Sequence, residues 1–286
     1  MISNVHKKRS SKGGISTVIS TVIITGAMIT IVSVALVFAN NFLWSRVAEG
    51  DFNSSKELMQ TAGLQIDDVA WTVGRTETIR YASQYGDVVL EPSVLHYVVS
   101  VETNEGTQEF SNETGVLLFK LPTSKYTVTN GYWERIFPSQ DESLTLKGTS
   151  ASVSRVFAVE KLPMYDGNYI RVVVAPAVRV LFSSINTSIS STFYVKMYLP
   201  VLTAGEAPRL SQSITLTGKS VEARTLNNVE SINVTVNFPS EGSGFNSEFF
   251  NFPYDSEEIP VPTSGYDNIV FELYLSEVSV EFGINY

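Results

Sequence analysis

The chain has 286 residues but no cysteine, only two histidines and a charged fraction of 17%. Without cysteine it forms no disulfides, thiol nucleophiles or thiolate metal sites. His6 and His96 are too few for a multi-histidine metal site, so the sequence predicts no metal ion and no cofactor. Ordinary globular proteins carry roughly 25% charged residues. The low charge, with abundant Ser, Thr, Val and Asn, is typical of β-rich surface proteins.

Positive charge is scarce, and part of it is concentrated at the N-terminus. The net charge is −9, yet the first residues contain no acid and carry four basic side chains, Lys7, Lys8, Arg9 and Lys12. The rest of the chain is therefore more acidic than the total indicates. Because nucleic-acid affinity depends on Lys and Arg contacts to phosphates, we expect no nucleic-acid partner.

Motifs for chemistry are missing as well. Gly218-Lys219-Ser220 resembles the end of a phosphate-binding loop, but Ser213 stands where that loop requires its first glycine. A Ser/His/Asp triad would have to use His96, and no G-x-S-x-G motif accompanies it. We therefore expect that the protein is not an enzyme. An anchored extracellular hydrolase that uses His96 is a minor alternative.

What the chain does contain is an uncharged, largely apolar run over residues 15–44. Since about 20 apolar residues cross a bilayer, we predict a transmembrane helix at 14–44, with Phe42 and Trp44 at the membrane interface. The basic leader, residues 1–13, should stay cytoplasmic, which places the remainder outside the cell as a single-pass protein. A secretory signal peptide is the alternative, but its apolar core is usually 7–15 residues long and ends in a small-residue cleavage motif.

Hydroxyl side chains recur inside this run. Thr17, Thr21 and Thr25 are four residues apart and share one helix face, and Gly26 leaves a flat spot beside them. Small and hydroxyl side chains allow helices to approach closely in lipid and to hydrogen-bond across the contact. We therefore predict that these four residues form a helix-packing face. Alternatively, the threonines bond to their own helix backbone and face any surroundings.

The junction between the leader and the apolar run reads Lys12-Gly13-Gly14-Ile15-Ser16-Thr17-Val18-Ile19. It resembles the class III signal sequence of archaeal type IV pilin-like proteins, over roughly residues 7–44. The resemblance implies that a prepilin peptidase removes the leader, with Lys12 and Gly13 before the cut and Gly14 as the new N-terminus. It also implies that the retained helix sits first in membrane lipid and later in the core of a helical filament.

Residues 45–73 are predicted to form a stalk with a second, amphipathic helix. Ser54 and Glu57 have the spacing of a capping box, and apolar residues recur at helical spacing after them. Glycine is costly inside a helix, so Gly50 and Asp51 should interrupt the chain between the two helices.

Residues 74–286 change to an alternation of apolar and polar side chains, which is typical of strands. One apolar set that should share a buried strand face is Leu95, Tyr97, Val99 and Val101. The predicted fold class is α+β: a transmembrane helix, an amphipathic helix and a large antiparallel, β-sandwich-like extracellular region. A candidate linker at 203–210 leaves both one sandwich and two smaller sheets open. The aromatics of residues 240–264 should fold onto the core or, less often, form a contact surface.

Four N-x-S/T sequons, at Asn53, Asn112, Asn186 and Asn233, are candidates for glycosylation if this region is extracellular. Two functional hypotheses share the anchor. In the first, the protein is a structural protein resembling a type IV pilin or pseudopilin. It would act in surface filament assembly or adhesion, as a homo-oligomer or with other pilin-like subunits, through its N-terminal helix. In the second, it is a permanently anchored binding subunit of a cell-envelope or archaellum-type complex, and its leader is not removed.

Overall fold

The protein has an α+β fold, with one long apolar N-terminal helix and a large β region whose strands are mostly antiparallel. It divides into two compact units, Met1–Arg46 and Val47–Tyr286, and we call the second unit the domain. The computed structural model describes residues 17–139, 143–205, 212–262 and 264–283.

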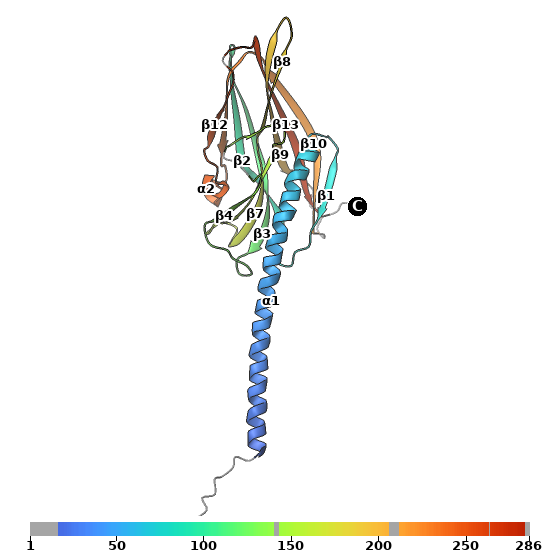
Figure 1. Ribbon diagram of the computed structural model, residues 1–286, viewed down its shortest axis with the longest axis vertical. Helices are drawn as coiled ribbons and strands as arrows, with labels where there is room; N and C mark the ends of the chain where they lie inside the picture. The colour runs from blue at the N-terminus through green and yellow to red at the C-terminus, as the bar shows by residue number, and fades with distance from the viewer. Residues whose placement is uncertain (1–16, 140–142, 206–211, 263, 284–286) are drawn as a thin grey trace, which may run out of the picture. The chain divides into compact units, whose positions relative to one another are not determined.

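Helix α1 runs without a break from Thr17 to Ala70 (Figure 1). The interruption predicted at Gly50 and Asp51, and the separate helix predicted to begin at Ser54, are therefore wrong. A buried stripe explains the continuity, because it passes through the predicted break. Its members recur every three or four residues and are Ala48, Phe52, Ser55, Met59, Ala62, Ile66 and Val69. Packing of this stripe on the domain outweighs the roughly 1 kcal/mol that a glycine costs inside a helix.

Two curled sheets form the rest of the domain (Figure 1). Across the first sheet lie, in order, β1 (Thr76–Arg80), β10 (Ser213–Leu226), β13 (Asn268–Phe282), β9 (Ser191–Ala204), β8 (Arg179–Asn186) and β5 (Leu146–Lys147). Across the second lie β12 (Ser256–Ile259), β11 (Val229–Asn237), β2 (Asp87–Thr103), β3 (Gly106–Pro122), β7 (Tyr169–Pro176), β6 (Ser154–Glu160) and β4 (Tyr132–Phe137). Between β11 and β12 in sequence come two short helical elements, η1 (Glu241–Ser243) and α2 (Ser247–Phe250).

Two strand pairs are parallel, which corrects the expectation of a wholly antiparallel region. Strand β13 pairs in parallel with β9, and β5 pairs in parallel with β8. Parallel neighbours need a long crossover connection. The chain between β9 and β13 supplies one, and it contains β10, β11 and β12. As a result β13 enters the first sheet between β10 and β9.

Apolar side chains of the domain form two clusters. The first collects residues from both sheets and from α2, and the second collects residues of α1 together with strands of both sheets. Strand β7 belongs to both clusters. Val173 and Ala175 lie in the first, whereas Val172 and Val174 lie in the second. Because both faces of β7 are covered, its residues 172–176 form a continuous apolar run rather than an alternating pattern.

The predicted alternation on β2 is confirmed, because Leu95, Tyr97, Val99 and Val101 are each no more than 1% exposed. The aromatics after β11 also fold onto the core, where Phe245, Phe249 and Phe250 are buried in the first cluster. Most of the candidate linker, residues 206–210, lies outside the described residues. The strands that flank it, β9 and β10, belong to the same sheet.

Candidate functional site

Residues 18–46 of α1 present a largely apolar surface, and their one charge is on Arg46. Every side chain in this segment is exposed, with Phe38 at 75% and Val18 at 69%. Among the described residues, α1 is the one helix that is long and apolar enough to cross a membrane. Folded proteins in water rarely expose so large an apolar surface, because burial of apolar area is favourable. This segment is therefore the clearest candidate for a function based on contact with an apolar partner.

The predicted packing face lies on this segment. A shallow groove along the helix surface is lined by Thr21, Val22, Thr25, Gly26 and Ile29. A Cβ atom added at Gly26 would meet nothing within 4 Å, so this glycine leaves the groove open. One nearby hydroxyl is used within the helix, because Thr30 Oγ1 donates to the Gly26 carbonyl at 2.9 Å. Three of the four predicted residues are thus brought together, and the side chain of Thr17 lies outside the described part of the chain.

Aromatic side chains and a basic residue follow at the C-terminal end of the segment. Phe42 and Trp44 are 59% and 48% exposed. The guanidinium of Arg46 lies 5.1 Å from the centre of the Phe42 ring, a cation–π distance. Exposed aromatics next to the first charge after an apolar helix are the composition found at membrane–water interfaces.

Asp51 ties the loop between β1 and β2 to α1. Its Oδ2 atom accepts hydrogen bonds from Ser83 Oγ at 2.8 Å, from the Gln84 backbone N–H at 2.8 Å and from the Tyr85 backbone N–H at 3.0 Å. Hydrogen bonds to an ionised acceptor are stronger than those between neutral groups. The polar residue expected to interrupt the helix therefore fixes a loop against it.

The C-terminal part of α1 approaches the sheets closely at two glycines. A Cβ atom at Gly63 would lie 2.9 Å from Ser154 Oγ, and this hydroxyl donates to the Gly63 carbonyl at 2.9 Å. A Cβ atom at Gly218 would lie 2.3 Å from the Val69 carbonyl oxygen. Gly218-Lys219-Ser220 is therefore a segment of β10 packed against the end of a helix, and not a phosphate-binding loop.

Charged side chains from β2, β3 and β7, together with Tyr165 and Asp166 from the loop before β7, form a network that we call the charge network. Arg171 is fully buried, and its Nη2 atom donates to Asp166 Oδ1 at 2.5 Å. Lys120 Nζ lies 2.7 Å from both Asp166 Oδ2 and Glu91 Oε1. Tyr165 donates its hydroxyl to Glu91 Oε2 at 2.7 Å. The network joins three strands at the edge of the first apolar cluster.

The shifted pKa values in the charge network all move away from neutrality. Burial opposes the charge of Asp166, but the hydrogen bond from Lys120 and the charge of Arg171 outweigh it, so the pKa of Asp166 is lowered. Burial also opposes the charge of Lys120, but its hydrogen bonds to Asp166 and Glu91 raise its pKa overall. Burial and the hydrogen bond to Glu91 raise the pKa of Tyr165. A general acid or base needs a pKa near the working pH, so these groups fit a structural role.

The residues predicted for leader processing, Lys12, Gly13 and Gly14, lie outside the described residues.

Two of the four sequon asparagines are exposed, Asn53 on α1 and Asn186 at the end of β8. Asn112 pairs with Tyr97 across β2 and β3, which puts its side chain on the core-facing side of the sheet. Asn233 is half-buried and accepts a hydrogen bond from a serine hydroxyl of β12 at 3.0 Å. Exposure therefore favours Asn53 and Asn186 as acceptors.

His96 lies on the outer face of β2. Its Nε2 atom is 2.5 Å from Ser111 Oγ on the neighbouring strand β3, and Glu113 is its register partner. A cross-strand hydrogen bond of this kind is a common stabilising contact in a sheet. Within the described residues, no three or more His, Asp and Glu side chains are placed to hold a metal ion.

A signal for the single helix is present in the sequence but is easily overlooked. Phe52, Met59 and Ile66 are seven residues apart and lie on one helix face, and Ala48 extends this stripe back across the polar residues. Other residues of the site have no such local signal. The contact that makes Gly63 necessary comes from β6, which is distant in the sequence.

Comparison with known proteins gives no match with a protein-family model, a curated protein or a solved structure. The features of the chain that bear on its function are the exposed apolar segment 18–46 and the groove at Thr21, Thr25 and Gly26.

Proposed function

We propose that the protein is a single-pass, membrane-anchored surface protein that assembles with copies of itself through its apolar helix. In this proposal residues 18–44 lie in membrane lipid, the leader stays in the cytoplasm and the domain lies outside the cell. The observation that supports it is the full exposure of a segment that is almost wholly apolar. Burial of one large apolar side chain is worth about 1.5–3 kcal/mol. A run of such side chains therefore strongly favours lipid or protein around it.

The groove supports a contact between helices. Lipid tails are as apolar as the helix, so association inside a membrane depends on close packing and on hydrogen bonds between helices. Thr21, Thr25 and Gly26 offer both a shallow surface and hydroxyl groups. The proposed role is structural, in filament assembly or adhesion, and not catalytic. Asn53 and Asn186 would then be candidate glycosylation sites on the extracellular side.

The resemblance at residues 12–19 to a class III signal sequence supplies the route to assembly. A prepilin peptidase would cut before Gly14, and the helix would then move from lipid into contact with other subunits. Mass spectrometry of the N-terminus in native membranes tests this step. The expected form begins at Gly14. If only the uncut chain is found, filament assembly is contradicted and a permanently anchored subunit is favoured.

Cysteine crosslinking tests the contact face, because the chain has no cysteine of its own. We expect Thr25→Cys, in the groove, to give disulfide-linked dimers of the chain when native membranes are oxidised. The matched control is Ala27→Cys, about 200° further around the helix, where few dimers should form. Equal yields at the two positions would rule out the groove as the contact. A single product with a different protein would favour a subunit of a mixed complex.

A further inference from the structure

The outer edge of strand β8 is covered only at its start. Strand β5 pairs with β8 at Arg179 and Val180 and then ends. From residue 182 to residue 190 every side chain is exposed, and Figure 1 shows the hairpin of β8 and β9 reaching past the neighbouring strands at one end of the domain. Residues 181–186 therefore form a strand edge that no strand of the described part of the chain covers. We call this segment the β8 edge.

The backbone groups of every second residue face outwards on the β8 edge. A hydrogen bond from the Thr187 N–H to the Ser190 carbonyl, 2.9 Å long, closes the hairpin. Because hydrogen-bonded and non-hydrogen-bonded pairs alternate in an antiparallel ladder, the N–H and C=O groups of Phe182, Ser184 and Asn186 point away from β9. Within the described residues these groups have no hydrogen-bond partner on the chain. Unpaired edge groups of this kind are a template for another strand.

The β8 edge also lacks the charges that usually prevent such pairing. Residues 180–195 contain no charged side chain. The same sheet has a second stretch of edge that no described strand covers, because β1 pairs with β10 only as far as Thr217. That stretch carries Lys219 and an exposed ion pair of Arg224 with Glu222. Charged side chains on an edge oppose pairing with other chains, so the β10 edge is protected and the β8 edge is not.

A second copy of the chain is the partner that the β8 edge fits. The net charge of the chain is −9, so two copies repel each other and can approach best where neither is charged. The acid beside the hairpin, Asp267, accepts a hydrogen bond from the Ser191 N–H at 2.7 Å, on the side of β9 away from β8. Phe182 and Ile185 are 39% and 55% exposed, and pairing removes part of this apolar area from water.

The outward groups determine how two copies pair. Two identical edges match about a two-fold axis when the strands run antiparallel and Ser184 meets Ser184 of the second copy. Phe182 of each chain then lies opposite Asn186 of the other, and each opposed pair exchanges both of its hydrogen bonds. A parallel pair of the same edges requires an offset of one residue, which breaks the two-fold symmetry.

Antiparallel pairing turns the second domain end over end. Arg179, at the start of β8, pairs with Asp67 near the C-terminal end of α1. From there β8 runs away from the part of α1 that begins at Val47, so the turn between β8 and β9 lies at the opposite end of the domain (Figure 1). Copies anchored in one membrane point the same way and do not meet in this arrangement, whereas copies on two facing membranes do.

We propose that the β8 edge binds the β8 edge of a second copy on a facing membrane, so that the domains join two cells. This contact deepens the adhesive role, and it rests on the proposed function in one respect, that the domain stands outside a membrane. It does not require the helix contact at Thr25. One pair of short strands is a small interface, so adhesion needs many copies on each surface.

Clustering of liposomes tests the contact. The full chain, purified from native membranes, is reconstituted into liposomes of neutral lipid, and flotation shows that it is anchored. Light scattering should then report clusters that persist in chelator and in high salt, because neither a metal ion nor an ion pair holds them. Flotation without clustering overturns the edge contact alone, whereas loss of flotation contradicts the anchor as well. Clusters that chelator disperses show metal bridges between acidic domains and overturn the edge contact.

Variants at the centre of the β8 edge separate pairing from folding. Ser184→Pro removes an outward N–H, and proline is tolerated on an edge strand where the N–H faces solvent. The thermal unfolding midpoint should stay, while the clustering rate falls about tenfold or more, the effect of losing one or two hydrogen bonds. The matched control Ser184→Ala keeps the N–H and should cluster as the unaltered chain does. Equal clustering of the two variants rules out the β8 edge.

Two further substitutions keep the test decisive if the proline variant unfolds at a lower temperature. Ser184→Lys places like charges opposite each other at the two-fold axis and should abolish clustering. Its control is Ala223→Lys, at an exposed position of the β10 edge, which should have no effect; equal clustering of these two variants overturns the contact. Asn186→Gln removes a sequon but keeps the backbone groups, so it should cluster normally. If it does not, a glycan makes the contact and strand pairing is wrong.

Discussion

Replacing Asp166 with asparagine tests how much the charge network contributes to the domain. The carboxylate faces two cations, with Arg171 Nη2 at 2.5 Å from one oxygen and Lys120 Nζ at 2.7 Å from the other. An asparagine side chain keeps one acceptor oxygen but turns an NH₂ group toward the second cation. Because Arg171 is fully buried, its charge then has no carboxylate at that position and no water to replace it.

The magnitude follows from what each cation retains. Removal of one partner from a buried ion pair typically costs about 3–5 kcal/mol. Arg171 still donates to the Tyr169 and Gly167 carbonyls, and Lys120 still pairs with Glu91. We therefore expect a loss near the lower end, about 3 kcal/mol in the free energy of unfolding. The free energy of unfolding of a small protein falls by about 1–3 kcal/mol for each molar of urea. A loss of this size therefore lowers the urea concentration at the unfolding midpoint by about 1 M or more.

Urea unfolding of the full chain in a neutral detergent measures this loss, followed by the near-ultraviolet circular dichroism of the buried aromatics. The control is Glu248→Gln, which breaks the ion pair with Lys161 at a carboxylate that is 80% exposed. Its free energy of unfolding should stay within about 0.5 kcal/mol of the unaltered chain. If Asp166→Asn changes stability no more than Glu248→Gln does, the network is not a significant source of stability.

Three further predictions concern the contacts of α1 and the stability of the domain at low pH. Asp51→Ala should speed hydrogen exchange of the Gln84 amide by about tenfold or more, because a bond to a charged acceptor is lost; unchanged exchange would contradict the loop anchor. Gly50→Ala should raise the free energy of unfolding by about 0.8–1.0 kcal/mol, because alanine is the better helix former. Gly63→Ala should lower it, because the added Cβ would lie 2.9 Å from a buried hydroxyl of β6. Equal effects of the two variants in urea unfolding would contradict the close packing of α1. Since the pKa of Asp166 is lowered from its ordinary value of 3.8, its contribution is complete above that pH and is lost as the pH falls through the lowered pKa. Acid titration of the free energy of unfolding should therefore be less steep in Asp166→Asn than in the unaltered chain.

Features that depend on neighbouring residues could be predicted from the sequence. The alternation of Leu95, Tyr97, Val99 and Val101 follows from the period of a strand and agrees with their burial. The apolar character of residues 18–46 is equally local. The predicted break at Gly50 was wrong because helix propensity is weak compared with packing. The buried stripe supplies that packing, and its effect depends on a partner surface built much later in the chain.

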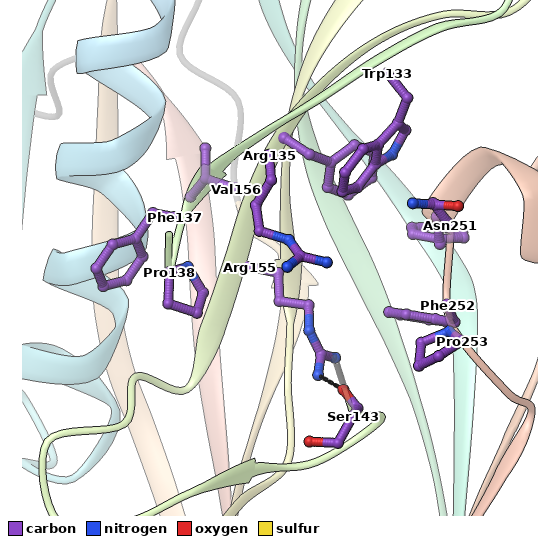
Figure 2. Close-up of a pocket in the computed structure, with 12 residues that line it drawn as sticks. Trp133, Arg135, Phe137, Pro138, Ser143, Arg155, Val156, Asn251, Phe252 and Pro253 are labelled. Atoms are coloured by element: carbon purple, nitrogen blue, oxygen red, sulfur yellow. Dashed lines mark hydrogen bonds between the residues drawn. The ribbon is translucent and has the colours of Figure 1, made fainter. Parts of the chain in front are cut away.

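Features that depend on strand order could not be predicted. Lys120, Asp166 and Glu91 meet only because β2, β3 and β7 are neighbours in one sheet. Trp133 and Asn251 line one small hollow (Figure 2), but they come from segments that are far apart in the sequence, so no local spacing marks them as neighbours. The aromatics after β11 could be identified as core residues, but the strand β6 that they pack against could not.

Strand β13 follows every other described strand in the sequence, yet it lies inside its sheet between β10 and β9. Until β13 has been synthesised, β9 and β10 each present an unpaired edge, and such edges pair readily with other chains. A newly made chain is therefore prone to aggregation from the time β9 is made until β13 joins the sheet. Chains that stop before residue 268 should accumulate as aggregates or be degraded, and should not persist as a smaller folded domain.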